Sequence, residues 1–105
     1  VAAGVREILD ILAERLPDTQ VVLHGVFPRG PTPFDGARLN NVAINQIIRR
    51  FHDGQRVHYL DIGHVFLEED GSISRDVMPD LLHLSREGYA RWAQALEPKL
   101  KELGL

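Results

Sequence analysis

Hydrophobic residues recur every three or four positions along three stretches of this chain, which is the pattern of helices with one buried face. The stretches cover residues 2–16, 40–54 and 86–103, and Ser85, directly before the last one, is a typical N-cap residue. We therefore expect three amphipathic helices. The residues expected to face inward are Val5, Ile8, Leu9, Leu12 and Leu16 in the first helix, Val42, Ile44, Ile47, Ile48 and Phe51 in the second, and Tyr89, Trp92, Ala93 and Leu96 in the third.

Two short runs of β-branched and other apolar residues, 20–25 and 56–63, predict buried strands between the helices. Strands that alternate with helices pair in parallel through right-handed crossovers, so the expected fold class is α/β. A long connection follows each strand, at residues 26–38 and 64–85, and ligands bind outside the carboxyl ends of parallel strands. Two strands are few for an independent sheet, so the pattern predicts the second half of a larger layered domain.

Composition narrows the classes of function without naming one. Hydrophobic residues make up 44% of the 105 residues and charged residues 26%, as in an ordinary globular chain. The net charge of -3 gives no basic footprint for nucleic acid, and no apolar run approaches the length of a membrane span. The absence of cysteine excludes disulfides and thiolate metal sites but leaves the compartment open. The chain starts without Met and already in a helical pattern, so we expect an upstream portion.

The segment PDLLHLSREGY, residues 79–89, contains an aspartate three positions before a histidine. This spacing can bring Asp80 and His83 to one side of a turn. A carboxylate that accepts a hydrogen bond from one imidazole nitrogen fixes the tautomer, and the other nitrogen can then take a proton from a nucleophile. On spacing alone, however, a turn-capping aspartate and a semi-buried structural histidine are the favoured explanation.

The same spacing recurs at Asp61 and His64, directly after the second predicted strand, with His58 nearby. Oxygen and nitrogen ligands of this kind are compatible with a metal site. The segment lacks the helical spacing of an H-E-x-x-H motif. A turn aspartate and a solvent-facing histidine are therefore favoured here too.

A serine nucleophile is not evident in this sequence. Ser72 and Ser74 fall in a long connection and Ser85 is better explained as a helix cap, so none lies at a strand-to-helix elbow. Asn40, Asn41 and Asn45 also lack the G-x-N context that would indicate an oxyanion donor. A base and its orienting acid are present, but a convincing nucleophile is not.

Four segments together resemble the carboxy-terminal half of the SGNH hydrolases, which are GDSL-type esterases, and in particular their platelet-activating-factor acetylhydrolase-like branch. The likeness extends from about residue 5 to about residue 100. Its strongest parts are the D-x-x-H-L-S-x-x-G-Y signature at 80–89 and the L-x-G-x-x-P-R-G-like loop at 23–30. The segments are VVLHGVFPRG, NNVAINQIIRRF, VHYLDIGHVFLEEDGSIS and MPDLLHLSREGY.

The resemblance implies a three-layer α/β/α flavodoxin-like fold and ester hydrolysis through an acyl-enzyme, without a cofactor. It assigns the general base to His83 and the orienting acid to Asp80. The family's serine and oxyanion donors belong to three blocks that precede this region, and none of these blocks is present in residues 1–105. We therefore expect residues 1–105 to be the carboxy-terminal part of one SGNH domain, inactive alone and completed by a missing amino-terminal half or another chain.

The favoured function is thus the carboxy-terminal half of a serine esterase that acts on small acyl esters, such as acetylated sugars or lipids. Two alternatives stay open. The chain could be a non-catalytic assembly module, because an unfinished parallel sheet leaves an edge for a partner or a second copy. It could, less readily, be a metal-dependent hydrolase that uses Asp61 and His64, together with Asp80 and His83.

Overall fold

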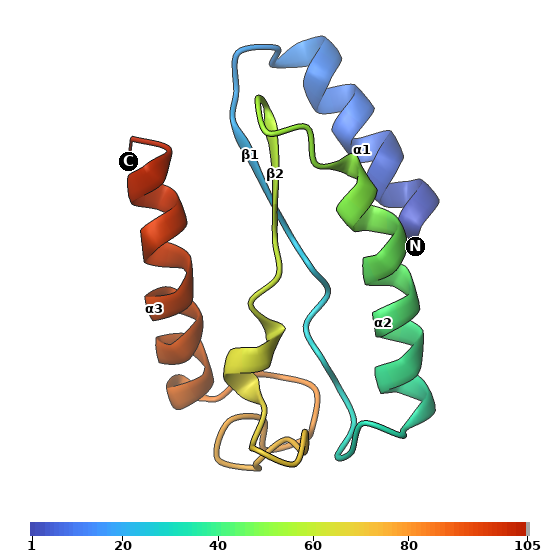
Figure 1. The fold of residues 1–105 in the computed structure, drawn as a ribbon, viewed down its shortest axis with the longest axis vertical. Coiled ribbons are helices and arrows are strands. Elements are labelled where there is room, and N and C mark those ends of the chain that lie inside the picture. The colour runs from blue at the N-terminus through green and yellow to red at the C-terminus, as the bar shows by residue number, and fades with distance from the viewer. Residues whose placement is uncertain (105) are drawn as a thin grey trace.

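Helices cover both faces of a two-stranded sheet in the computed structural model, which describes residues 1–104. The elements are α1 (Ala2–Arg15), β1 (Val21–His24), α2 (Gly36–Ile48), η1 (Arg49–Phe51), β2 (Val57–Leu60), η2 (Gly63–Phe66) and α3 (Arg86–Glu102), where η denotes a short 3-10 helix. Figure 1 shows α1 and α2 on one side of the strands and α3 on the other. This arrangement confirms the α/β fold class, as part of a three-layer sandwich. No helix of residues 1–104 has the length and hydropathy of a membrane span.

The strands β1 and β2 pair in parallel, with Val21 opposite Val57 at the start of the ladder. Helix α2 connects them, which confirms the pairing expected from alternating helices and strands. Both strands are shorter than the sequence predicted. After β1, the side chain of Asn45 accepts a hydrogen bond from the amide of Val26 at 2.7 Å and donates to its carbonyl at 3.0 Å. This side chain takes the place of a neighbouring strand.

Helix α2 begins at Gly36 rather than at residue 40, and its buried face differs from the predicted apolar stripe. Val42 and Ile47, both expected to face inward, are 48% and 46% exposed. Polar residues take their place because the connection after β1 offers backbone groups for them to bind. The buried residues of α2 are Arg38, Asn41 and Ile48.

Parts of the predicted inward faces of α1 and α3 are also exposed. In α1, Ile8 and Leu16 are 60% and 51% exposed, whereas Leu9 is buried. In α3, Tyr89 is 57% exposed and Ala93 is exposed as well. A sheet of two strands is narrow, so each helix covers it with only a thin stripe of side chains.

The most deeply buried cluster lies in the connection after β2. Phe66, Ile73, Val77 and Met78 form it, each at most 5% exposed. These buried side chains anchor the connection of residues 61–85 to the core, although many of its other residues are exposed. The partly buried side chains packed against the cluster are Phe27, Val65, Leu67, Leu81, Leu84 and Trp92. The end of this connection, which carries Asp80 and His83, is therefore held by the core.

Candidate active site

The structure brings Asp80 and His83 together in one tight turn. The Nδ1 atom of His83 lies 2.6 Å from Oδ2 of Asp80. The other carboxylate oxygen, Oδ1, accepts hydrogen bonds from the backbone amides of His83 at 2.7 Å and Leu82 at 3.0 Å. Asp80 therefore fixes both the backbone of the turn and the orientation of the imidazole ring.

This geometry has clear electrostatic consequences. The His83 side chain, and then the amides of His83 and Leu82, hold the pKa of Asp80 well below its usual range. An ionised Asp80 accepts a hydrogen bond from the Nδ1–H of His83 and leaves Nε2 as the nitrogen that can take up a proton. The His83 side chain is 78% exposed, so Nε2 is accessible to a reacting group.

Leu81, inside this turn, has a backbone conformation that is unusual for its residue type. Its φ angle is 61°, in the left-handed region, and it is the only residue other than glycine with a positive φ among residues 1–104. Its amide donates to the carbonyl of Met78 at 2.9 Å, and its own carbonyl accepts from Gly30 at 3.2 Å. Left-handed residues of this kind cost on the order of 1–3 kcal/mol and persist where the surroundings determine them.

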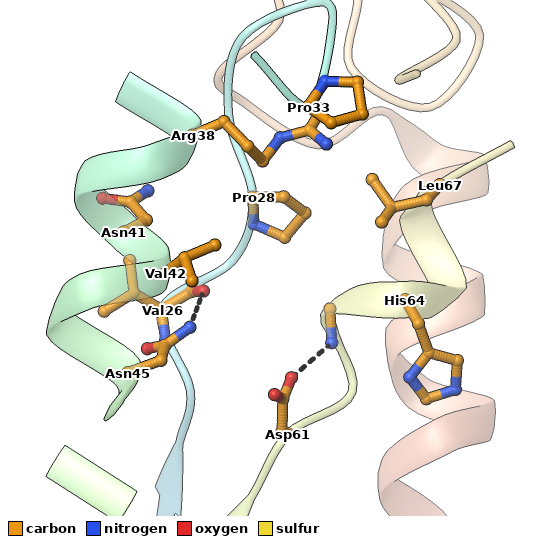
Figure 2. Close-up of a pocket in the computed structure, with 11 residues that line it drawn as sticks. Val26, Pro28, Pro33, Arg38, Asn41, Val42, Asn45, Asp61, His64 and Leu67 are labelled. Atoms are coloured by element: carbon orange, nitrogen blue, oxygen red, sulfur yellow. Dashed lines mark hydrogen bonds between the residues drawn. The ribbon is translucent and has the colours of Figure 1, made fainter. Parts of the chain in front are cut away.

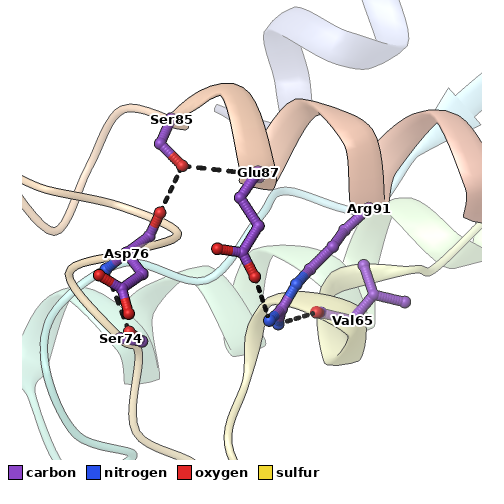
Figure 3. A network of polar contacts seen from close by, with 7 residues as sticks. Val65, Ser74, Asp76, Ser85, Glu87 and Arg91 are labelled. Carbon is purple, nitrogen blue, oxygen red and sulfur yellow. Dashed lines mark hydrogen bonds and ion pairs between the residues drawn. The ribbon is translucent and has the colours of Figure 1, made fainter.

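Ser85 caps α3, as the sequence predicted, and it also joins the helix to the connection that carries the turn (Figure 3). Its Oγ accepts from the amide of Gly88 at 3.2 Å and donates to the carbonyl of Asp76 at 2.5 Å. Farther along, Arg91 donates to the carbonyl of Val65 at 3.0 Å. These bonds attach the first two turns of α3 to the connection after β2, at Asp76 and at Val65 of η2.

Gly88, the glycine of the D-x-x-H-L-S-x-x-G-Y motif, occupies a position where a side chain would not fit. A Cβ atom at this position would lie 2.8 Å from the carbonyl oxygen of Val77 and 2.8 Å from Cδ2 of Leu84. These distances are shorter than a carbon can approach without displacing its neighbours. The absent side chain therefore lets α3 lie directly against the segment that leads into the turn.

A pocket of about 530 Å³ opens beside this turn. We call it the aromatic pocket, after His24, Phe27 and Trp92, which line it together with Arg29 and Leu82. Leu82 precedes His83 directly, so one wall of the pocket belongs to the turn that carries the candidate base. The pocket is formed where β1 ends, as expected for a parallel sheet.

Asp61 and His64 line a second pocket, of about 400 Å³ (Figure 2). Asp61 accepts a hydrogen bond from the amide of Gly63 at 3.2 Å, as turn aspartates do. His58 is buried elsewhere, with Nε2 2.6 Å from Oε1 of Gln20. Over residues 1–104, no three carboxylate or imidazole groups gather as a metal site would require. The structure therefore gives the metal alternative no support.

Sequence reasoning missed a polar clamp on the connection between β1 and α2. The guanidinium of Arg38 donates to the carbonyls of Arg29 at 3.2 Å, Gly30 at 2.9 Å and Gly71 at 2.7 Å. Asn41 adds a bond to the carbonyl of Phe27. The available signal was the spacing of residues 38, 41 and 45, which places three polar side chains on one face of a helix.

Comparison with known proteins agrees with this geometry. Residues 1–91 match the GDSL-like Lipase/Acylhydrolase family. Platelet-activating factor acetylhydrolase IB subunit alpha1 of Homo sapiens is 38% identical over 104 residues, which cover 98% of this chain and 45% of the relative. The alpha1 subunit of Bos taurus is also 38% identical, with 98% and 44% covered, and the alpha2 subunit of Rattus norvegicus is 33% identical, with 98% and 45% covered.

The chain thus spans less than half the length of the curated relatives it matches, while they match nearly all of it. The matched residues, 1–91, include the ends of β1 and β2, beside which the two pockets open, and the turn with Asp80 and His83. The resemblance seen in the sequence motifs is confirmed at the level of the family. This chain belongs to the GDSL-like lipase/acylhydrolase family.

Proposed function

We propose that this chain supplies the general base and its orienting acid to a serine-type ester hydrolase. The observation that carries the proposal is the Asp80–His83 pair, with Nδ1 held at 2.6 Å and the ring 78% exposed. Membership of an acylhydrolase family supports the same chemistry. The proposal includes the assignment of residues 1–105 as the carboxy-terminal part of a single domain.

The proposed reaction uses a serine from outside residues 1–105. Its hydroxyl oxygen attacks the ester carbonyl while Nε2 of His83 takes the hydroxyl proton, and Asp80 stabilises the imidazolium that results. His83 then gives the proton to the departing alcohol, which leaves an acyl-enzyme. Water then attacks the carbonyl of the acyl-enzyme, with His83 again as the base. The acid is released, and His83 returns the proton to the serine oxygen. The isolated chain is expected to show no His83-dependent turnover, because it contains neither the nucleophile nor the oxyanion donors.

The substrate proposed is a small acyl ester, with acetyl esters of sugars or lipids favoured. The relatives are named as acetylhydrolases, which supports an acetyl group on the substrate. A small-molecule ester is the partner we propose, because ester hydrolysis is the chemistry of the acylhydrolase family.

Hydrolysis of p-nitrophenyl acetate by the protein from its complete reading frame tests the proposal. We expect His83→Ala and Asp80→Asn each to lower kcat by about 10³–10⁴-fold, because they remove the base or leave its tautomer unfixed. His64→Ala is the matched control, since His64 also follows an aspartate by three residues but lies at the other pocket. Activity in His83→Ala as high as in His64→Ala would contradict the proposal.

Assembly is the second candidate function, and one observation favours it. Within residues 1–104, β1 pairs with β2 alone, so the outer edge of β1 has unpaired backbone groups. Such an edge can accept a strand from another chain. Size-exclusion chromatography with light scattering tests this for the isolated chain: a concentration-independent monomer would count against assembly.

A further inference from the structure

A hydrogen bond joins Trp92 of α3 to His24 of β1, and the esterase proposal does not use it. The indole Nε1–H lies 3.0 Å from Nε2 of His24. Nε2 can accept this bond only when it carries no proton. Burial lowers the pKa of His24, although a backbone hydrogen bond with Val22 acts in the opposite direction. The neutral imidazole needed as the acceptor is thus favoured near neutral pH.

Aromatic contacts fix the indole in one orientation. The ring centroids of His24 and Trp92 are 5.6 Å apart at an angle of 88°. Phe27 meets the same indole edge-on, at 5.3 Å and 83°. Edge-to-face contacts of this type favour a defined geometry as well as burial. The hydrogen bond adds direction, because a half-buried indole N–H without a partner would be costly.

The fixed indole forms a wall of the aromatic pocket beside the candidate base. Trp92 and Phe27 line this pocket, and Leu82 completes it next to His83. The indole N–H is already bonded to His24, so Trp92 offers a ligand only an apolar surface. Most of the other lining side chains are apolar too, with Arg29 and Asn41 as polar exceptions. The part of the pocket formed by Trp92 and Phe27 therefore suits an apolar group, and the indole takes up space that a longer group would need.

We propose that Trp92 determines the specificity of the esterase by restricting the aromatic pocket to a compact apolar group of the ester, and that His24 is the positioning residue that holds Trp92 in place. This inference rests on the proposed function and adds a substrate class to it. The compact group belongs either to the acid or to the alcohol of the ester. Both present the same apolar surface, and two substrate series distinguish them.

Chain-length specificity of the complete protein is the first test. One series varies the acyl group, from p-nitrophenyl acetate to hexanoate, and the other varies the alcohol, from methyl to hexyl acetate. Trp92→Ala is expected to raise kcat/KM for the longest member relative to the shortest by about tenfold or more in one of the series. His24→Leu should shift the same ratio in the same direction, but less. The series that responds identifies the group bound.

Tyr89→Ala is the matched control, because Tyr89 also contacts Trp92, at 5.9 Å, but does not line the pocket. This variant should leave the ratio unchanged. If Trp92→Ala left the ratio of kcat/KM between the longest and shortest substrates unchanged in both series, the inference would be overturned and the proposed function would stand. Absence of hydrolysis by the unmodified complete protein would overturn the proposed function, and the inference with it.

The indole N–H resonance in a ¹⁵N-correlated NMR spectrum tests the positioning role independently of turnover. Trp92→Phe assigns the resonance. His24→Leu is expected to move it upfield and to speed its exchange with water, because the acceptor is lost. His24→Gln can present a carbonyl oxygen to the same N–H and should restore much of the chain-length ratio. An indole resonance that is unchanged in His24→Leu would refute the role assigned to His24.

Discussion

Asp53 and Asp80 each have a carboxylate oxygen that accepts hydrogen bonds from several backbone amides. The amides of Val57, Arg56 and Gln55 lower the pKa of Asp53 from 3.8 to about 2. Asp53 stabilises a turn before β2 and has no place in the proposed chemistry. A lowered pKa is therefore not what marks the candidate site. Asp80 differs because its second oxygen holds an imidazole, and only that contact prepares a group for proton transfer.

Leu81 offers a prediction at the scale of one residue. Leu81→Gly and Leu81→Ala both remove packing against the core, but only Gly relieves the left-handed φ of 61°. We expect Leu81→Gly to have a higher free energy of unfolding than Leu81→Ala, by about 1 kcal/mol. Urea unfolding followed by circular dichroism measures the difference.

The control for Leu81 is Leu84, a core neighbour whose φ is not positive. Here the usual order should hold, with Leu84→Ala more stable than Leu84→Gly. The same order at both positions would show that the turn is not strained at Leu81.

At the scale of elements, α3 is positioned by its first two turns. Ser85 bonds the connection at Asp76, and Arg91 bonds η2 at Val65. The start of this helix could be predicted because an N-cap serine is a local signal. The face that it buries could not be predicted, because that face depends on the neighbouring elements. Tyr89 is exposed for this reason, although its spacing fits the apolar stripe.

Gly88→Ala tests the close approach of α3 to the core. We expect it to lower the free energy of unfolding by about 1–3 kcal/mol, because the new methyl group would meet the Val77 carbonyl at 2.8 Å. Gly4→Ala in α1 is the control, since, apart from its chain neighbours and the nearby backbone of its own helix, no atom lies within 4 Å of the position that its new methyl group would take. That variant should be about 0.5–1 kcal/mol more stable than the parent. Chemical denaturation compares the two, and equal gains in stability would contradict the packing described.

At the scale of the whole molecule, Arg38 joins segments that are distant in sequence. Its guanidinium reaches from α2 to carbonyls at residues 29 and 30 and at Gly71, in the connection after β2. It is 5% exposed, so these bonds are protected from water. This one side chain thereby connects the loops that follow the two strands, between which ligands of parallel sheets bind.

Arg38→Lys should lower the free energy of unfolding by about 2–3 kcal/mol, because a lysine ammonium cannot reach three carbonyls in the fork geometry of a guanidinium. Arg50→Lys is the control, since Arg50 is exposed, and its effect should stay within about 0.5 kcal/mol. Urea unfolding of both variants measures this. An effect of Arg38→Lys no larger than that of the control would show that the clamp does not stabilise the fold.

Local sequence was enough to predict the features that depend on neighbours along the chain: three helices, two parallel strands and the Ser85 cap. The D-x-x-H spacing made contact between Asp80 and His83 possible. The structure was needed to show it, because Asp61 and His64 have the same spacing and Asp61 instead bonds the amide of Gly63. Tertiary structure decided which helix faces are buried, how Arg38 clamps the loops, and that Trp92 meets His24, 68 positions away. Contacts of that range depend on how the layers pack, and hydrophobic periodicity carries no information about the partner.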